Sequence, residues 1–177
     1  MKTVGTIIGR IPLTETSLIV QWCTGEQGLL KTVAKGARRP KSPFAGKVDL
    51  FYKCEIEVHP ARRGDLHILK DLMVLDSRFG LRRSYLQTLG ASYFVKLINR
   101  GAESETPIPE LDDLLNRALD YLNGTDVNLR AVHHFEKQMA DILGISHPET
   151  EPVTSLADHF GSLPDQREEL MKRLKSP

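Results

Sequence analysis

The first eighty residues place apolar and polar side chains in the two-residue period of β-strands. In the clearest stretch, residues 49–59, every second position is apolar: Leu50, Tyr52, Cys54, Ile56 and Val58. The positions between them carry Phe51 and three charged residues, which indicates a strand with one buried and one solvent-facing side. Runs rich in β-branched and aliphatic residues predict four more strands, at residues 3–11, 17–24, 29–36 and 66–76.

Turn-forming residues separate these predicted strands, most clearly at residues 25–28 and 60–65. Five short strands within about eighty residues are typical of a small closed or nearly closed barrel. In five-stranded barrels of the OB type, a groove and its flanking loops bind single strands through backbone charge and base stacking.

The period changes after Asp76, where apolar residues begin to recur three and four positions apart. This spacing predicts helices over residues 86–98, 111–122 and 128–143, with two short helices near 156–160 and 164–174. We therefore predict an α+β chain in which a five-stranded OB-fold barrel, residues 1–80, precedes an α-helical domain, residues 81–177. The boundary falls near residues 76–83.

Charge is distributed unevenly along the chain, although the net charge is only +1. Residues 1–83 carry fifteen Lys and Arg against eight Asp and Glu, whereas residues 84–177 carry nine against fifteen. Such asymmetry favours contact of the basic half with nucleic acid or a membrane surface. No acidic residue occurs from residue 27 to residue 48.

The centre of this acid-free stretch, residues 33–47, is called the basic segment here. Its cations are Lys35, Arg38, Arg39, Lys41 and Lys47. Several cations that each displace a counterion from a phosphate add up to polyanion affinity, and arginine adds a planar fork that fits phosphate. The segment is therefore either a phosphate-binding surface or an ordinary solvated loop. Arg62 and Arg63, in the turn before the last strand, could extend the basic surface.

Aromatic residues could supply the base stacking that OB folds use. Phe44 lies inside the basic segment, where it could stack on a base or plug the loop. Phe51 is predicted on the solvent-facing side of its strand, where it could stack or pack against the helical domain. Trp22 and Tyr52 follow the apolar set and are predicted to be core residues.

Signals for catalysis, metals and membranes are lacking. The chain contains no GxxxxGK[ST], GxGxxG or GxSxG motif, and its histidines have no ligand-like spacing. Cys23 and Cys54 are too few for a disulfide scaffold or a four-cysteine zinc site and are predicted to be core residues. We expect no enzyme activity, no catalytic residues, no metal and no cofactor. We also expect no membrane partner and a cytoplasmic, nucleoid-associated protein.

The basic segment also resembles a signature of the bacterial RecO family of DNA repair and recombination mediators. Further stretches resemble that family in the same order, namely residues 13–46, 63–98 and 139–145. The resemblance implies an N-terminal OB fold, a helical C-terminal domain, binding of single- and double-stranded DNA, and annealing. It also implies the partners RecR and single-strand DNA-binding protein, the latter often through its acidic, apolar tail, and loading of recombinase onto coated strands.

By this resemblance, DNA contact is expected at the matching positions Lys35, Arg38, Arg39 and Lys41. The chain departs from the pattern in two respects. Many relatives carry a four-cysteine zinc module after the third helix, but residues 146–166 contain no cysteine, so we expect no zinc. The helical domain also ends early, which leaves the tail-binding site unassigned. An RNA-binding OB module remains an alternative, because contacts to phosphates and stacked bases distinguish ribose from deoxyribose poorly. A protein-interaction adaptor, whose basic loop meets an acidic partner, is a second alternative.

Overall fold

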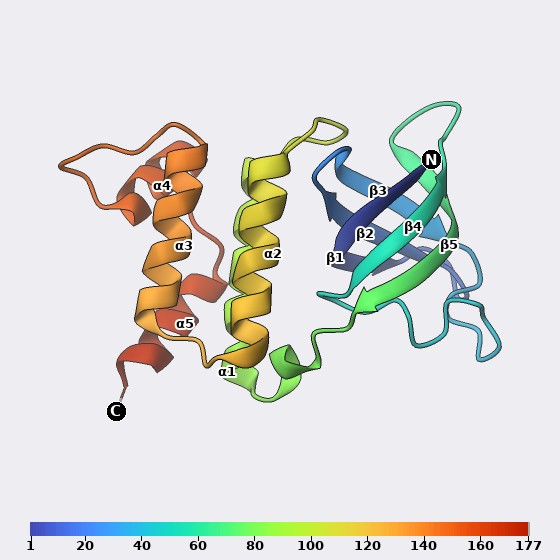
Figure 1. Cartoon of the computed structure of the whole chain (residues 1–177), viewed down its shortest axis with the longest axis horizontal. Helices are drawn as coiled ribbons and strands as arrows, with labels where there is room; N and C mark the ends of the chain where they lie inside the picture. Colours follow the sequence, from blue (N-terminus) through green and yellow to red (C-terminus); the bar gives the residue numbers. More distant parts are fainter. Residues whose placement is uncertain (177) are drawn as a thin grey trace. The chain divides into compact units, whose positions relative to one another are not determined.

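The computed structural model describes residues 1–176 and begins with five strands that close into a barrel (Figure 1). The strands are β1 (Lys2–Pro12), β2 (Leu18–Thr24), β3 (Gly28–Ala34), β4 (Lys53–His59) and β5 (Leu66–Asp76). Their order around the barrel is β1-β2-β3-β5-β4, and every neighbouring pair is antiparallel except β3 and β5. The predicted five-stranded barrel is confirmed.

The barrel core contains one face of each strand. In β4, Cys54, Ile56 and Val58 are buried while Glu55 and Glu57 are exposed, as the alternation predicted. The core also contains Trp22, whose indole Nε1–H donates to Thr32 Oγ1 at 2.9 Å, so its polar atom is satisfied inside the barrel. Trp22, Tyr52 and both cysteines are buried, which confirms their assignment to the core.

The segment before β4 differs from the prediction. β4 begins at Lys53, and residues 49–52 form a turn in which the Tyr52 amide donates to Asp49 O. Phe51 has a positive φ of 73°, which breaks the alternation and turns its side chain away from solvent, leaving it 2 % exposed. Its predicted solvent-facing position is therefore wrong. Buried Arg78 donates from Nη1 to Phe51 O at 3.0 Å and fixes this turn.

Five α-helices follow the barrel, and all five were predicted within a few residues. They are α1 (Tyr85–Gly101), α2 (Pro109–Gly124), α3 (Leu129–Ile142), α4 (Pro152–Phe160) and α5 (Gln166–Lys175), with a short 3₁₀ turn, η1 (Phe79–Arg82), before them. Asn128 caps α3 by accepting from the Ala131 amide at 2.9 Å. Pro152 begins α4, where its missing N–H is not needed.

The chain divides into two compact units. Residues 1–78 and 102–112 form the barrel unit, and residues 79–101 together with residues from 113 onward form the helical unit. The division at residue 80 into two folding domains stays a prediction. Residues 102–112, called the strap here, pack with the barrel. The strap brings Glu103, Glu105, Glu110 and Asp112 into the barrel unit, which then holds thirteen Lys and Arg against twelve Asp and Glu.

Candidate nucleic-acid interface

The basic segment is pinned to the loop between β1 and β2. The Gly36 amide donates to Ser17 Oγ at 3.2 Å, and the Arg38 amide donates to Thr16 O at 2.9 Å. The Arg38 guanidinium also donates from Nη1 to Thr14 O at 3.3 Å. Two loops at the same end of the barrel are thereby joined, and the basic segment is held on a fixed base.

Successive turns shape the basic segment itself. The backbone amides of Arg39, Ser42, Ala45 and Lys47 each donate to the carbonyl three residues earlier, at 2.9 to 3.0 Å. Gly46 takes a positive φ of 71°, in the left-handed region that glycine adopts without strain. The chain thus folds back repeatedly and presents its cations in a compact group.

Phe44 anchors the basic segment to the barrel core. Its side chain is 6 % exposed and belongs to the barrel core cluster, and its amide donates to Ser42 Oγ at 3.1 Å. A ring buried in this way offers no face to a base. The burial favours the second of the two roles that the sequence allowed, the plug.

The five cations of the basic segment are all exposed: Lys35, Arg38, Arg39, Lys41 and Lys47. Within residues 1–176 none of them is held in an ion pair, whereas Arg10 pairs with Asp49 and Lys31 with Asp65. A cation without a carboxylate partner keeps its full charge for an incoming anion. Within the described chain, the segment is therefore the most concentrated free positive charge of the barrel unit.

Arg10 stands beside this group, and sequence reasoning did not find it. Its Nη1 donates to Val48 O at 2.8 Å, and its Nη2 lies 3.2 Å from Asp49 Oδ1. With Arg38 and the edges of Phe44 and Tyr52, it lines a hollow of about 330 Å³. No spacing rule links Arg10 to residues nearly thirty positions away, since only barrel closure brings them together.

Arg62 and Arg63 are exposed on the loop between β4 and β5, apart from the basic segment in the chain. This loop is fixed by His67, whose Nδ1 accepts from the Ala61 amide at 3.0 Å. The other ring nitrogen therefore carries the proton and donates to Glu105 of the strap at 2.7 Å. The loop is tied to both β5 and the strap.

Lys31 also points to solvent from β3, but it is paired. Its Nζ lies 2.9 Å from Asp65 Oδ2, next to the arginine loop. The hydrogen bond from Lys31 lowers the pKa of the Asp65 carboxyl below its usual range, so the carboxylate persists into mild acid. Asp65 therefore offsets one of the cations that this part of the surface carries.

The strap adds negative charge at the opposite end of β3 from the basic segment. The Leu29 amide donates to Glu103 O at 3.3 Å, and the Glu105 amide donates to Leu29 O at 3.1 Å, so the strap pairs with β3. The Ile108 amide donates to Gly25 O in the β2–β3 turn. The basic segment and the strap thus place charge of opposite sign near the two ends of β3.

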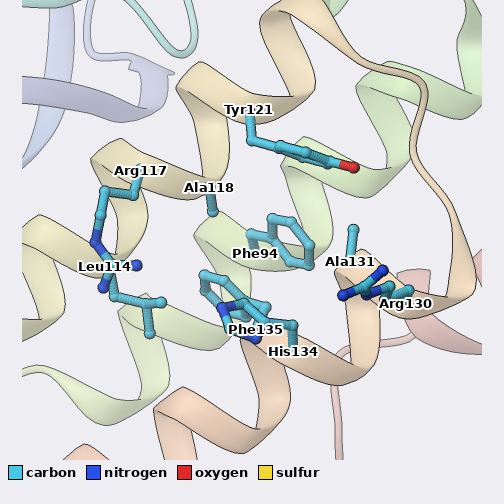
Figure 2. Close-up of a pocket in the computed structure, with 9 residues that line it drawn as sticks. All are labelled: Phe94, Leu114, Arg117, Ala118, Tyr121, Arg130, Ala131, His134 and Phe135. Carbon is cyan, nitrogen blue, oxygen red and sulfur yellow. The ribbon is translucent and has the colours of Figure 1, made fainter.

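The helical unit contains a separate pocket, called the helical pocket here, of about 480 Å³ (Figure 2). Its apolar floor includes Phe94 of α1 and Phe135 of α3, whose rings stack with centroids 4.0 Å apart. Arg117 and Tyr121 of α2 and Arg130 of α3 stand around it. An apolar pocket with a basic rim suits a ligand that combines an apolar group with carboxylates.

Burial disfavours the thiolate form of both cysteines. Burial raises the pKa of the Cys54 thiol to about 12. Burial, together with the neighbouring Asp112 carboxylate, also raises the pKa of Cys23. Among the described residues no group of three or more His, Cys, Asp or Glu is placed to hold a metal ion. No helix in the same part of the chain has the length and apolar character needed to span a bilayer.

Comparison of the sequence with known proteins identifies a family for this chain. Residues 1–78 match the family model described as "Recombination protein O N terminal". The chain belongs to the RecO family. It is 30% identical over 149 residues to the DNA repair protein RecO of Rhodopirellula baltica, an alignment that covers 84% of this chain and 54% of that protein.

Two further RecO proteins show similar coverage. The relative from a Cyanothece species is 38% identical over 122 residues, covering 68% of this chain and 41% of the relative. The relative from Idiomarina loihiensis is 32% identical over 141 residues, covering 78% and 58%. The chain spans about half the length of the curated RecO relatives it matches. The basic segment lies within the matched RecO N-terminal domain.

Proposed function

We propose that this protein is a DNA repair and recombination mediator that binds single- and double-stranded DNA with the basic segment and anneals complementary strands. One observation carries the proposal: five exposed cations, with no ion-pair partner within residues 1–176, stand together on a segment pinned to the barrel of a RecO N-terminal domain. Arg10, Arg62 and Arg63 extend the proposed surface.

The physical basis is neutralisation of phosphate charge. Each cation that meets a phosphate releases condensed counterions, and this term acts on any sequence and on single or double strands. A strand held through its phosphates keeps its base edges free, so a second strand can pair with it. Annealing by this route involves no covalent step, and we propose that the protein works without enzyme activity.

The test replaces Lys35, Arg38, Arg39 and Lys41 together with Ala and measures DNA affinity at several salt concentrations. The slope of log affinity against log salt should become shallower by about 0.7 to 0.9 for each phosphate that the variant no longer neutralises. The matched control replaces Lys96, Lys137, Lys172 and Lys175 of the helical unit, which removes the same charge. An unchanged slope in the first variant, or an equal change in both, contradicts the proposal.

We further propose that the helical pocket receives the acidic, apolar tail of single-strand DNA-binding protein. Ala118, Tyr121 and Ala131, which line the pocket and are not buried, would take an apolar side chain, and Arg130 would face the carboxylates. RecR is a proposed partner on the strength of family membership. Such contacts would place the mediator on coated strands, where it helps to load recombinase.

RNA is the alternative ligand for the barrel, because phosphate contacts do not distinguish the sugars. Competition between DNA and RNA strands of one sequence separates the two. Preferential displacement by RNA would replace DNA with RNA in the proposal. Binding that survives nuclease treatment and needs only an acidic protein would point to an adaptor instead.

A further inference from the structure

Two rows of side chains cross the outer face of β1, β4 and β5, which lie side by side in the barrel (Figure 1). The strand register aligns three residues in each row: Val4, Glu55 and Met73 in the first, and Lys2, Glu57 and Asp71 in the second. Residues in register point to the same side of a sheet, so the members of each row are neighbours. We call these six residues the β4 face.

The β4 face is exposed and mixes apolar with acidic side chains. Its chain neighbours Thr3, Ile56 and Leu72 are buried in the barrel, and side chains alternate between the two faces along each strand. Val4 is 40 % exposed and Met73 is 55 % exposed. Within residues 1–176 the three carboxylates of the face are held in no ion pair, so their charge is available to a partner.

A hollow of about 330 Å³ extends the β4 face toward the β2–β3 turn. The carboxylates of Glu26 and Asp112 line it together with Glu55, and Lys2 lines it as well. A Lys or Arg side chain that enters the hollow can lay its aliphatic stem on Val4 and bring its charged end to the carboxylates. The β4 face therefore suits a partner that presents several cations and a modest apolar surface.

The basic segment has this complementary composition. Its five cations are exposed, and Pro40, Pro43 and Ala45 stand exposed between them. These three residues add apolar surface without side-chain polar groups that would lose water on contact. Opposite charge on two such surfaces steers their encounter and favours one docking arrangement over others.

Within one copy of the chain the two surfaces do not meet. The basic segment is pinned to the β1–β2 loop through Ser17 and anchored in the core by Phe44. None of its cations lies in an ion pair with a carboxylate of the β4 face within residues 1–176. Contact between the two surfaces therefore takes a second copy, and it is heterologous, because each copy uses a different surface.

We infer that the β4 face binds the basic segment of a second copy of this chain, so that copies associate head to tail when no DNA is bound. The carboxylates of one copy then cover the cations that the neighbouring copy needs for phosphate. DNA binding and self-association exclude each other, and a strand must displace the neighbouring copy. This regulatory consequence rests on the proposed function, whereas the contact between copies does not.

Sedimentation velocity at several protein concentrations tests the contact. Exposed ion pairs are individually weak and are screened by salt, so copies should associate at about 10 mM salt, where the Debye length is about 30 Å, and separate at about 1 M. At high salt the mass should be that of one chain, 19.9 kDa. Adding an oligothymidine of about eight nucleotides at low salt should also release single copies, each with bound DNA.

The face variant combines Glu55→Gln with Glu57→Gln and should weaken association at low salt about tenfold, because two ion-pair partners are lost. The matched control replaces Glu149 and Glu151, two exposed carboxylates of the helical unit, with Gln and should associate like the parent. Met73→Ser leaves the charge unchanged and should weaken association about threefold, because the stems of the cations lose apolar contact. Circular dichroism checks that each variant is folded.

A mixing experiment separates a specific contact from general attraction between charged proteins. The face variant keeps its basic segment, and a second variant, Arg39→Gln with Lys41→Gln, keeps its β4 face. Each variant alone should associate weakly. A mixture should form one-to-one pairs, because the intact basic segment of the first variant meets the intact β4 face of the second.

The inference is overturned if the parent stays a single copy at low salt, if the control loses association as fully as the face variant, or if the mixture forms no pairs. The proposed function would still stand if the basic-segment variant shows its shallower salt slope. Association that persists with oligothymidine bound would overturn the mutual exclusion. An unchanged slope together with intact association would reject the DNA contacts and leave the contact between copies.

Discussion

Phe44 shows how one buried side chain can support a proposed binding surface without forming part of it. Its ring is buried in the barrel core, while the cations of the same segment are exposed. Phe44→Ala should lower the free energy of unfolding by about 3 to 5 kcal/mol, since it empties a core position. Urea denaturation measures this change.

Phe44→Leu is the control, because it keeps most of the buried volume and removes only the aromatic ring. It should retain DNA affinity and most of the stability. If Phe44→Leu instead lost single-strand affinity while its unfolding curve matched the parent, the ring would be a stacking residue and the plug interpretation would fail.

Asp65 is a residue whose removal should strengthen DNA binding. Asp65→Asn releases Lys31 from its ion pair. The freed cation can meet a phosphate, so the salt slope should steepen by up to about 0.7 to 0.9. Asp71→Asn removes the same charge from an exposed position on β5 and is expected to have a smaller effect.

The effect of the Lys31–Asp65 ion pair on DNA affinity should depend on pH. Because the pKa of Asp65 is lowered in the folded protein, the pair is formed above the ordinary aspartate pKa and is lost as the pH falls through the lowered value. The parent and Asp65→Asn should therefore differ in DNA affinity at neutral pH and converge in acid. A constant difference between them across this range would rule out the ion pair as the cause.

At the scale of elements, one buried carboxylate joins three helices of the helical unit. Glu136 of α3 is 1 % exposed, accepts from Tyr93 Oη of α1 at 2.7 Å, and lies 2.6 Å from Arg167 Nε of α5. Burial is the largest cause that raises the pKa of Tyr93, with the Glu136 carboxylate adding to it, so the phenol stays protonated and keeps donating.

Glu136→Gln should therefore destabilise the helical unit by about 3 kcal/mol, because Arg167 loses its buried counter-charge. Thermal unfolding followed by circular dichroism measures the loss. Glu169→Gln provides the comparison, since its pair with Arg173 is solvent-exposed and should be worth about 0.5 kcal/mol or less. Equal losses in the two variants would mean that burial does not strengthen the Glu136 pair.

At the scale of the whole molecule, the two proposed binding sites lie in different compact units, so single variants should separate them. Arg130→Glu, at the rim of the helical pocket, should abolish binding of the tail peptide and leave DNA affinity unchanged. Replacing Lys35, Arg38, Arg39 and Lys41 with Ala should do the reverse. Fluorescence anisotropy with labelled peptide and labelled DNA measures both.

Lys137→Glu makes the same charge change on α3 outside the helical pocket and should preserve peptide binding. If Lys137→Glu weakened the peptide as much as Arg130→Glu, long-range charge rather than the pocket would explain the effect. If Arg130→Glu also reduced DNA affinity, the two sites would not be independent.

The charge asymmetry between the two halves of the sequence largely disappears when charges are counted by compact unit. Counted by compact unit, the helical unit has eleven Lys and Arg and eleven Asp and Glu, and the barrel unit has one more cation than anion. The strap moves four carboxylates onto the barrel side. The positive charge of the basic segment is therefore a local feature that the net charge of the barrel unit does not reveal.

The sequence by itself determined the elements of this protein: five strands, five helices and the exposed cations of the basic segment. These follow from short-range periodicity and composition, because a strand or helix is specified by residues within a few positions of one another. The resemblance of the basic segment to the RecO family was likewise recognisable from the sequence alone. Local pattern therefore sufficed for the fold class and for the family.

Only the tertiary structure decided which side chains meet. The buried positions of Phe44 and Phe51, the Lys31–Asp65 pair, the place of Arg10 beside Arg38, and the strap along β3 all depend on contacts between distant segments. Strand register is the clearest case, since it aligns four residues from four strands: Ile11, Ile19, Val33 and Ile68. Register and barrel closure arise from packing of the whole core, which no local window of sequence contains.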